Sequence, residues 1–218
     1  MVDRGPAPRR GRPPVSDEQR RRQRLAISRH AVRLFSEQGL AATSGEQIAR
    51  ASGVSERTLW RHFPHKESCV EPLLTKTIDA FRTVLHAWPP DVDLAEHLRS
   101  AYQPVLNSPS ATDVEAVLAV IRLTHDEPAL RAAYLVLRER AEDTLAEVLS
   151  ARTGVPSDAL PVRVEAAAMN AALKVATDDL IHETAESGIT PDALLRHREH
   201  LADAISFVTR RAPGDGRD

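Results

Sequence analysis

The stretch GEQIARASGVSERTLWRHF, residues 45–63, has the composition of two short helices joined by a tight turn. Just before it, Ser44 stands three positions ahead of Gln47, which is the spacing of a capping box. A helix is therefore expected to begin at Gly45, although glycine is a poor helix former. The predicted first helix covers 45–51.

The turn and the second helix follow directly. Gly53 permits the left-handed backbone conformation that a tight turn between two crossed helices needs. Ser55 can cap the next helix, which is predicted over 55–62. Val54 and Leu59 are expected to fill the angle between the two helices.

The outer face of the second helix is rich in basic and hydrogen-bonding side chains. Arg57, Thr58, Arg61 and His62 remain there once the apolar stripe is buried. Such a helix fits the major groove of DNA, where arginine can read guanine edges or hold phosphates, and threonine can bond a phosphate or touch a thymine methyl. The alternative is a helical hairpin whose arginines are merely solvated.

Residues 24–70 as a whole resemble the DNA-binding domain of the TetR family of bacterial transcriptional regulators. The shared features are an LF pair followed by E-x-G, a T-S pair, the runs I-A-x-x-x-G-V-S and T-L-aromatic-x-H-F, and K-E. The resemblance implies that the recognition helix runs from Ser55 to His62. It also implies DNA-backbone contacts by Thr43, Ser44, Trp60, His62 and Lys66.

Trp60 departs from the family pattern, because the family most often has tyrosine at this position. An indole N–H can still donate to a phosphate oxygen, but an indole cannot accept a hydrogen bond as a tyrosine hydroxyl can. The other interpretation of Trp60 is a core anchor beneath the following helix.

A basic arm precedes these helices. Residues 1–15 are rich in arginine and proline and are expected to be disordered. Within them, the run Arg9, Arg10, Gly11, Arg12 and Pro13 contains an R-G-R-P core that resembles an AT-hook. Guanidinium groups next to a glycine can enter a narrow, A·T-rich minor groove, so the arm is predicted to bind DNA.

The whole chain predicts an all-α fold. Only 9 glycines occur in 218 residues, no strand-like alternation stands out, and apolar residues recur at helical spacing. About nine helices are expected, over 17–38, 45–51, 55–62, 66–87, 93–107, 111–125, 127–153, 158–186 and 191–211. In the fourth of these, Pro72 must delay the start or kink the helix.

The expected domain layout combines the predicted helices and the charge distribution with what the TetR resemblance implies. We expect a disordered arm over 1–15, a helix-turn-helix domain over 16–65 with its motif at about 44–63, a helical effector-binding and dimerisation domain over 66–211, and a disordered tail over 212–218. Residues 1–66 hold 14 Lys and Arg against 6 Asp and Glu, whereas residues 67–218 hold 15 against 25. A basic first third suggests an anionic polymer as its partner, although chance variation in solvated charge would give the same totals.

The TetR resemblance also implies that the helices of the acidic region surround a pocket for a small-molecule effector. Residues 122–160 are loosely similar to regulators whose effector domain takes acyl-CoA-like ligands, including the mycofactocin-type regulators. Polar groups that interrupt apolar helix faces are the candidate ligand contacts. They are Arg122, His125, Tyr134, Asn170 and Lys174, and each would equally fit the surface or the core.

The last two helices are the candidate dimer interface. The segment 164–181 is crowded with alanines, which let a neighbouring helix approach closely, and the last helix has an apolar stripe. In the TetR family the last two long helices pair with their symmetry mates. The residues predicted to do so here are Ala167, Ala171, Leu194, Leu201 and Ile205, unless these faces only close the core of one chain.

Several classes of protein and site find little support. No G-x-S-x-G, P-loop, dinucleotide or H-E-x-x-H motif occurs, so neither an enzyme nor a cofactor is predicted. His197 and His200 lack an evident third ligand, so no metal site is predicted either. Lone Cys69 rules out an intrachain disulfide. No apolar run approaches the roughly 18 residues of a membrane helix, and the N-terminus lacks a secretory signal, so we expect a cytoplasmic protein without a membrane partner.

The sequence therefore predicts a homodimeric repressor that leaves a near-palindromic operator on double-stranded DNA when a ligand binds. The helix at 66–87 would link the pocket to the recognition helix. A transcriptional activator, a ligand-independent or architectural DNA-binding protein and, more remotely, an α-helical enzyme are the alternatives.

Overall fold

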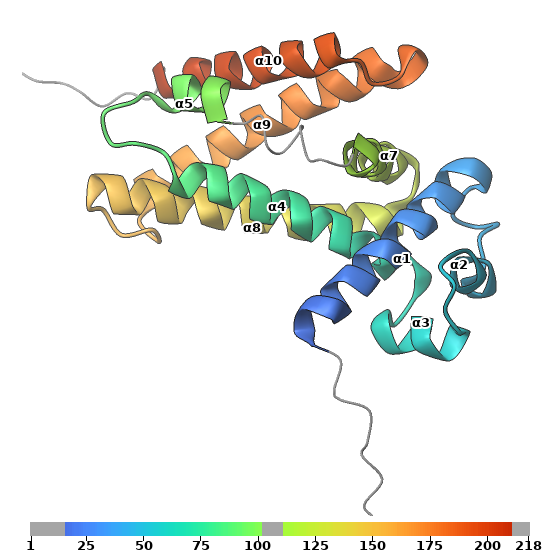
Figure 1. Cartoon of the computed structure of the whole chain (residues 1–218). Coiled ribbons are helices and arrows are strands. Elements are labelled where there is room, and N and C mark those ends of the chain that lie inside the picture. The colour runs from blue at the N-terminus through green and yellow to red at the C-terminus, as the bar shows by residue number, and fades with distance from the viewer. Residues whose placement is uncertain (1–15, 102–110, 211–218) are drawn as a thin grey trace, which may run out of the picture.

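The computed structural model describes residues 16–101 and 111–210. All regular structure in these residues is helical (Figure 1), as the sequence predicts. The elements are α1 (Asp17–Gln38), α2 (Gly45–Ala51), α3 (Glu56–His62), the 3₁₀ helix η1 (Lys66–Val70), α4 (Glu71–His86), α5 (Leu94–Ala101), α7 (Ala111–Asp126), α8 (Pro128–Thr153), α9 (Leu160–Ser187) and α10 (Pro191–Arg210).

The predicted helix bounds agree closely with the observed ones. The first two helices begin and end where predicted, and α3 begins one residue late because Ser55 is its cap. The single helix expected over 66–87 is a 3₁₀ turn followed by α4, because Pro72 is confined to the first turn of α4. The predicted ends at 102–107 and 211 lie outside the described residues.

The helices form two groups, and α4 connects them (Figure 1). α1, α2 and α3 lie together at one end of the molecule. In the other group, α9 packs against both α8 and α10. α4 lies along α8, and α7 lies between α1 and α8. None of the helices in the described part of the chain is both long and apolar enough to cross a membrane.

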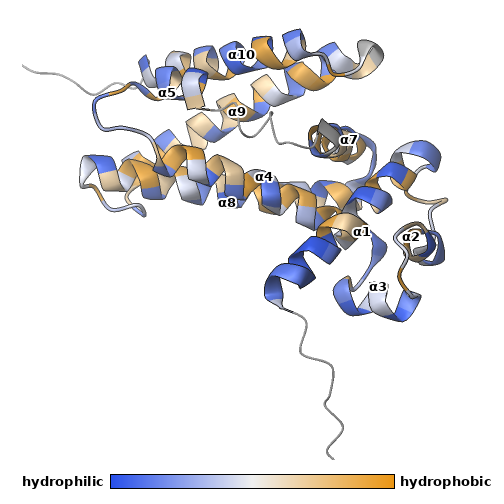
Figure 2. Cartoon of the chain, in the orientation of Figure 1, coloured by the Kyte–Doolittle hydropathy of each residue, from blue (hydrophilic) through white to orange (hydrophobic). Residues whose placement is uncertain are grey.

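The core explains why the two groups are held together. One apolar cluster contains Phe35 and Phe63 of the first group together with Leu73 and Leu130 of the second. A second cluster lies farther along, around Leu85 and the inner faces of α9 and α10. Figure 2 shows apolar residues where the long helices meet and a hydrophilic start of α1. Because α4 contributes to both clusters, a shift of α4 must disturb both.

Candidate functional site

The helix-turn-helix is built by short, local hydrogen bonds. The Ser44 hydroxyl accepts from the Gln47 N–H at 3.2 Å, and the Gln47 side-chain oxygen accepts from the Ser44 N–H at 2.7 Å, which completes the predicted capping box. In the turn, Gly53 has a φ of 65°, and the Val54 N–H donates to the Ala49 carbonyl at 3.0 Å. The turn therefore requires a residue that tolerates the left-handed region.

The recognition helix α3 buries one stripe and exposes another. The Ser55 hydroxyl accepts from the Thr58 N–H at 3.2 Å, and Leu59 is fully buried. Arg57 and Arg61 point into solvent, and neither guanidinium has a hydrogen-bond partner among the residues that the structure describes. Both arginines are therefore available to an outside acceptor.

The C-terminal end of α3 is fastened to α1. The Arg24 guanidinium donates to the His62 carbonyl at 2.9 Å and stacks over the Phe63 ring at 4.7 Å. The His62 imidazole lies 3.2 Å from the Gln23 side-chain oxygen. Burial lowers the pKa of His62, and Arg61 and Arg24 lower it further, so the ring bonds as a neutral group at neutral pH.

Trp60 lies against the start of α2. Its side chain remains 42% exposed, which excludes the alternative interpretation of Trp60 as a core anchor beneath the following helix. A Cβ added to Gly45 would stand 2.0 Å from the indole Cζ2, which shows that the ring rests on the space that glycine leaves. The indole thus lies at the junction of α2 and α3.

Two residues that the family resemblance places at phosphate make contacts within the chain. Thr43 is buried, and its hydroxyl donates to the Gly39 carbonyl at 2.8 Å, so the expected phosphate contact of this side chain is corrected. The Lys66 ammonium donates to the carbonyls of Leu40 at 2.6 Å and Thr43 at 2.9 Å. It ties the turn before α2 to η1 and keeps one N–H for another acceptor. Arg9, Arg10 and Arg12 lie outside the described residues.

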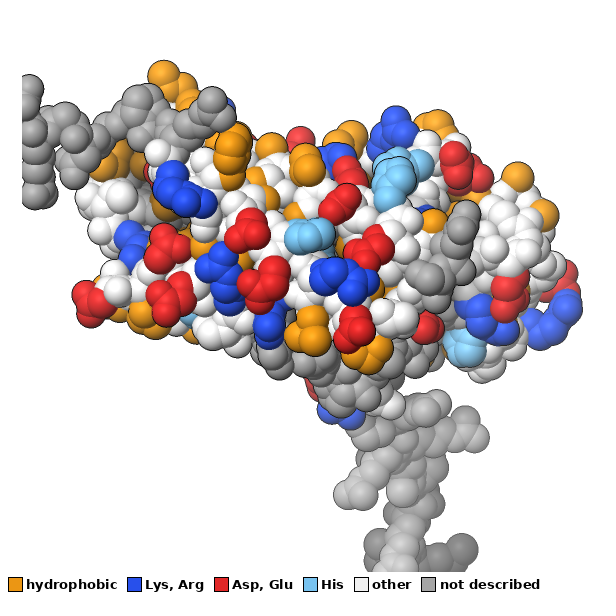
Figure 3. Space-filling model, turned by 90° about the horizontal axis from the view of Figure 1, so that it is seen from above, with side chains coloured by type: hydrophobic (Ala, Val, Ile, Leu, Met, Phe, Trp, Pro, Cys, Tyr) orange, Lys and Arg blue, Asp and Glu red, His pale blue; other side chains and the backbone are white. Residues whose placement is uncertain are grey.

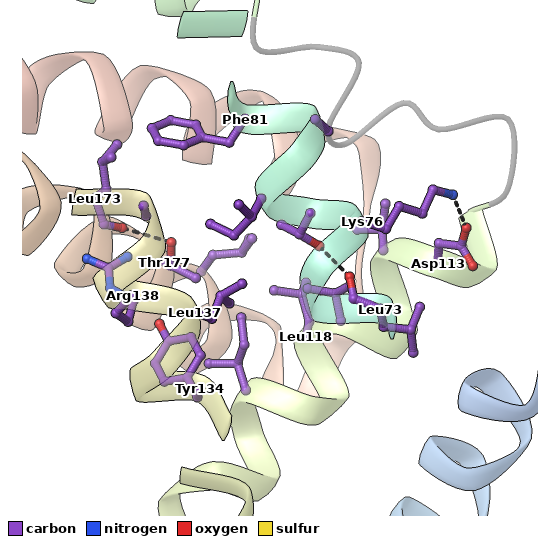
Figure 4. A pocket seen from close by; sticks show the side chains of 18 of the residues that line it. Leu73, Lys76, Phe81, Asp113, Leu118, Tyr134, Leu137, Arg138, Leu173 and Thr177 are labelled. Carbon is purple, nitrogen blue, oxygen red and sulfur yellow. Dashed lines mark hydrogen bonds and ion pairs between the residues drawn. The ribbon is translucent and has the colours of Figure 1, made fainter. Parts of the chain in front are cut away.

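A cavity of about 160 Å³ lies between α4, α7, α8, α9 and α10. Most of its lining is apolar, and Figure 4 shows Tyr134 and Arg138 of α8 on one side and Lys76 of α4 at the opposite edge. Thr177 and buried His197 add further polar atoms to the lining. An apolar cavity with a few polar groups has the character of a small-molecule site.

Two groups of the cavity have pKa values shifted by burial. His197 places Nδ1 3.1 Å from the Ala176 carbonyl, and burial lowers its pKa to about 4. The ring is therefore neutral at pH 7 and Nδ1–H donates to that carbonyl. Burial also raises the pKa of Tyr134, so its hydroxyl remains a hydrogen-bond donor.

Asp113 connects the edge of the cavity to the DNA-binding helices. The Arg29 Nε donates to one carboxylate oxygen at 2.5 Å and Nη2 to the other at 2.9 Å, and Lys76 pairs with the same carboxylate. The hydrogen bond from Arg29 is the main reason that the pKa of Asp113 lies below its ordinary value. One buried carboxylate therefore joins α1, α4 and α7.

The chain matches two family models over most of its length. One, described as bacterial regulatory proteins of the tetR family, covers residues 27–73, and the other, the MftR C-terminal domain, covers residues 92–206. The HTH-type transcriptional regulator TcmR of Streptomyces glaucescens is 33% identical over 151 residues, which are 67% of each chain. The chain belongs to the TetR family.

Solved structures of TetR-type regulators show the same fold. GusR of Salmonella enterica, 18% identical, has a TM-score of 0.60 over 90% of this chain and 97% of its own. A regulator from Mesorhizobium loti, also 18% identical, has a TM-score of 0.58 over 88% of this chain and 97% of its own. This TetR-family protein is thus a DNA-binding transcriptional regulator with the fold that its sequence predicts.

The predicted ligand residues of this TetR regulator lie in several places. Only Tyr134 lines the cavity, and Arg122 lines a separate groove against α1. Asn170 is buried between α8 and α9, where its Nδ2 donates to the Arg138 carbonyl at 3.1 Å. His125 and Lys174 are exposed outside the cavity. The predicted cavity contact is therefore corrected for all of these residues except Tyr134. Asn170 faces α8, Arg122 faces the separate groove, and the other two face solvent.

The prediction missed Arg138, Thr177 and His197 of the TetR regulator's cavity. Arg138 was within reach of sequence reasoning, because it lies one helical turn after Tyr134 and shares its face. Thr177 and His197 face the cavity only because of how α9 and α10 are rotated, which no local pattern specifies.

The predicted dimer residues divide by burial. Leu201 and Ile205 are each 1% exposed and lie in the core of their own chain, so their assignment to a dimer interface is corrected. Ala171 is exposed, whereas Ala167 and Leu194 are half-buried. Other large apolar side chains are exposed on the last two helices, namely Leu160, Val164, Val175, Leu195 and Phe207.

The face of the TetR regulator seen in Figure 3 is charged. Acidic and basic side chains are interspersed over it, with apolar side chains at several points of its edge. Ion pairs join Arg99 of α5 to Glu199 and Asp203 of α10 at 3.0 and 2.8 Å. These pairs fasten α5 to α10 at the surface.

Proposed function

We propose that this regulator is a homodimeric repressor that leaves a near-palindromic operator when a small apolar molecule enters the cavity. The observation that supports it most is the position of α4. At one end α4 is joined to the recognition helix through η1, and along its length Leu73, Thr77 and Phe81 line the cavity.

The DNA surface is proposed around α3. Arg57 and Arg61 would read guanine edges or hold phosphates, with Thr58 beside them. Contacts with the DNA backbone are also proposed for Ser44, Ser55, Trp60, His62 and the remaining N–H of Lys66. The exposed arginines and the fixed orientation of α3 support this surface. The arm with Arg9, Arg10 and Arg12 is proposed to follow the adjacent minor groove.

The effector is proposed to be an apolar metabolite with one polar group facing Tyr134 and Arg138. The mostly apolar lining supports an apolar body. The multidrug binding protein EbrR, solved in complex with ethidium, shares the fold at 20% identity, with a TM-score of 0.54 over 85% of this chain and 98% of its own. Acyl-CoA-like compounds belong among the candidates, given the match to the MftR C-terminal domain.

Ligand binding and DNA binding would be linked through α4 and Asp113. A ligand that contacts Thr77 and Phe81 favours one position of α4, and Asp113 transmits the position of α4 and α7 to Arg29 on α1. By linkage, a ligand that weakens operator binding must itself bind less tightly to the DNA complex.

The dimer is proposed to form through the outer faces of α9 and α10. Val164 and Val175 are 58% and 66% exposed and lie on α9 with exposed Ala171 between them. Leu195 and Phe207 extend the apolar surface on α10. Two-fold pairing would place two recognition helices on half-sites about 34–36 Å apart. Because chromosomal DNA is the proposed partner, we place the protein in the cytoplasm.

The proposal is tested by selecting bound sequences from random duplex DNA with the purified protein. A regulator should select an inverted repeat and bind it about 10³-fold or more tightly than random duplex. Equal affinity for all duplexes would instead indicate an architectural protein. Metabolites from a panel are then added one by one to the operator complex, and a metabolite that releases the protein from the DNA is identified as the effector.

A matched pair of variants shows whether an identified effector uses the cavity. Leu137→Trp fills the cavity, whereas Leu135→Trp, two residues away, adds the same ring to an exposed position. The Leu137→Trp variant should still bind the operator but should no longer release it when the effector is added. The Leu135→Trp variant should bind the operator and release it as the wild type does. Release that survives Leu137→Trp unchanged would contradict the cavity assignment. Reporter transcription that rises with intact protein and falls without it would indicate an activator.

A further inference from the structure

A second hollow lies on the opposite side of α7 from the cavity. It is a groove of about 510 Å³ between α1 and α7, and Gly188 and Ile189 of the turn that joins α9 to α10 also line it. Ala116, Ala119 and Arg122 of α7 face this groove, whereas Val117, Leu118 and Ile121 face the cavity. The two hollows are therefore separated by α7 itself.

The floor of the groove is apolar and its rim is basic. Val32, Ala119 and Ile189 contribute apolar surface. Three arginines and His30 line the groove, against one acidic lining residue, Glu115. This composition gives an apolar trough under an excess of positive charge, which suits a molecule with an apolar body and an anionic end.

The arginines of the rim differ in how firmly they are held. Arg29 is committed to Asp113 by two hydrogen bonds. Arg33 reaches Glu37 only at 3.5 Å, and both side chains are 55% exposed, so this pair is weak. Arg122 is half-buried and has no ion pair within the described ranges. Its guanidinium is thus available to an anionic acceptor that enters the groove.

We propose that this groove binds an amphipathic carboxylate, with the carboxylate on Arg122 and Arg33 and the apolar body over Ala119 and Ile189. A guanidinium binds a carboxylate through two parallel N–H donors, and partial burial strengthens that contact. The bound molecule touches α1 of the DNA-binding helices and α7 of the effector region together. It therefore acts as a second ligand, at a site independent of the cavity.

Octanoate is the probe, and 1-octanol is the neutral control with the same chain. Binding to the full chain is measured by isothermal titration calorimetry in the absence of DNA, so failure of the repressor proposal leaves this test intact. Octanoate should bind more tightly than octanol. Arg122→Gln should weaken octanoate by roughly tenfold and leave octanol unchanged.

Three further variants locate the site. Ala119→Trp fills the groove and should abolish octanoate binding. Arg140→Gln removes an exposed arginine of α8 and should have no effect, and neither should the cavity variant Leu137→Trp. If Ala119→Trp does not fold, the result for Arg122→Gln tests the proposal alone. The Arg122 side chain reaches the solvent, so this substitution should not prevent folding.

Three results would overturn the proposal. They are the absence of octanoate binding, an equal loss with Arg122→Gln and Arg140→Gln, and a loss with Leu137→Trp while Ala119→Trp binds normally. The last result would assign octanoate to the cavity.

Discussion

The indole of Trp60 occupies the space above Gly45, where a Cβ would come within 2.0 Å of Cζ2 and 2.6 Å of Cη2. Each residue is unusual by itself, since glycine begins a helix poorly and the family most often has tyrosine at the position of Trp60. The two residues fit together, because the larger indole ring needs a residue without a side chain at position 45. The crossing of α2 and α3 is therefore set by this pair as well as by the turn.

Gly45→Ala is the first prediction. Alanine would favour α2 by up to about 1 kcal/mol through helix propensity. The clash with the ring forces a shift, and overpacking of this kind costs about 1–3 kcal/mol. We expect a lower melting temperature and weaker operator binding, measured by thermal unfolding and by DNA titration.

The control for this prediction is the same substitution in a Trp60→Tyr background. The shorter tyrosine ring lacks the outer indole carbons, so Gly45→Ala should cost less there. An equal cost in both backgrounds would show that the Trp60 contact is not responsible.

Arg57→Ala and Arg61→Ala are the second prediction. A lost phosphate contact should weaken all duplexes alike and reduce the slope of log affinity against log salt by about 1, whereas a lost base contact should cost about 1–3 kcal/mol and relax specificity at one position. Operator titrations at several salt concentrations separate the two. Arg140→Ala, at an exposed position of α8, is the matched control, and an equal effect there would show that both results reflect only the change in net charge.

Asp113→Asn is the third prediction. Loss of the carboxylate leaves Arg29 and Lys76 without their shared partner, which should lower the free energy of unfolding by about 1–3 kcal/mol at pH 7. Because the pKa of Asp113 is lowered in the folded protein, its contribution is present above about pH 4 and is lost on further acidification.

Unfolding of wild type and variant between pH 3 and pH 7 checks this dependence on Asp113. The two stability curves should converge at low pH. Asp79→Asn, which breaks an exposed pair on α4, should cost under about 1 kcal/mol. If the difference in free energy of unfolding between wild type and Asp113→Asn were the same at all pH values, the charge of Asp113 would not be the cause of the stabilisation.

His197→Gln is the fourth prediction. Burial lowers the pKa of His197 to about 4, whereas in the unfolded chain it lies near 6.5, so between these values the unfolded state binds more protons. Stability is then complete above about pH 6.5 and falls by about 2 kcal/mol between pH 7 and pH 5. Chemical unfolding at both pH values should show that the variant loses this difference, while His182→Gln at an exposed position retains it.

Cys69 provides the fifth prediction. The thiol is fully buried, and burial raises its pKa to about 12. A thiol reagent such as dithionitrobenzoate should therefore not react with the folded protein at pH 8, and should modify one thiol per chain after denaturation. Rapid reaction under native conditions would show that η1 opens readily.

Local patterns were sufficient for the helices and the turn. Ser44, Ser55 and Gly53 act within a few residues of chain, so their capping bonds and the positive φ follow from sequence spacing. The same reasoning located α3 and the exposed arginines. The family resemblance placed Lys66 toward DNA, and no local pattern predicted that its ammonium would fasten the turn before α2, because that contact spans 26 positions.

The pocket and the dimer surface were harder, because each depends on how whole helices are rotated. Asn170 and Lys174 interrupt apolar stretches and so resembled ligand contacts. The rotation of α9 instead places Asn170 against α8 and Lys174 in solvent. Leu201 and Ile205 formed an apolar stripe as expected, yet the stripe faces the chain's own core.

The sequence by itself determined an all-α fold with a helix-turn-helix, since capping, turn chemistry and helical periodicity are properties of neighbouring residues. The regulator function followed from the resemblance of residues 24–70 to the TetR family. Only the tertiary structure decided that Asp113 joins Arg29 to Lys76, that Trp60 requires Gly45, and that Arg122 faces a groove separate from the cavity. These relationships bring together residues distant in the chain, and helix packing, which sets the rotation of each helix against its neighbours, is the physical reason that no local pattern specifies them.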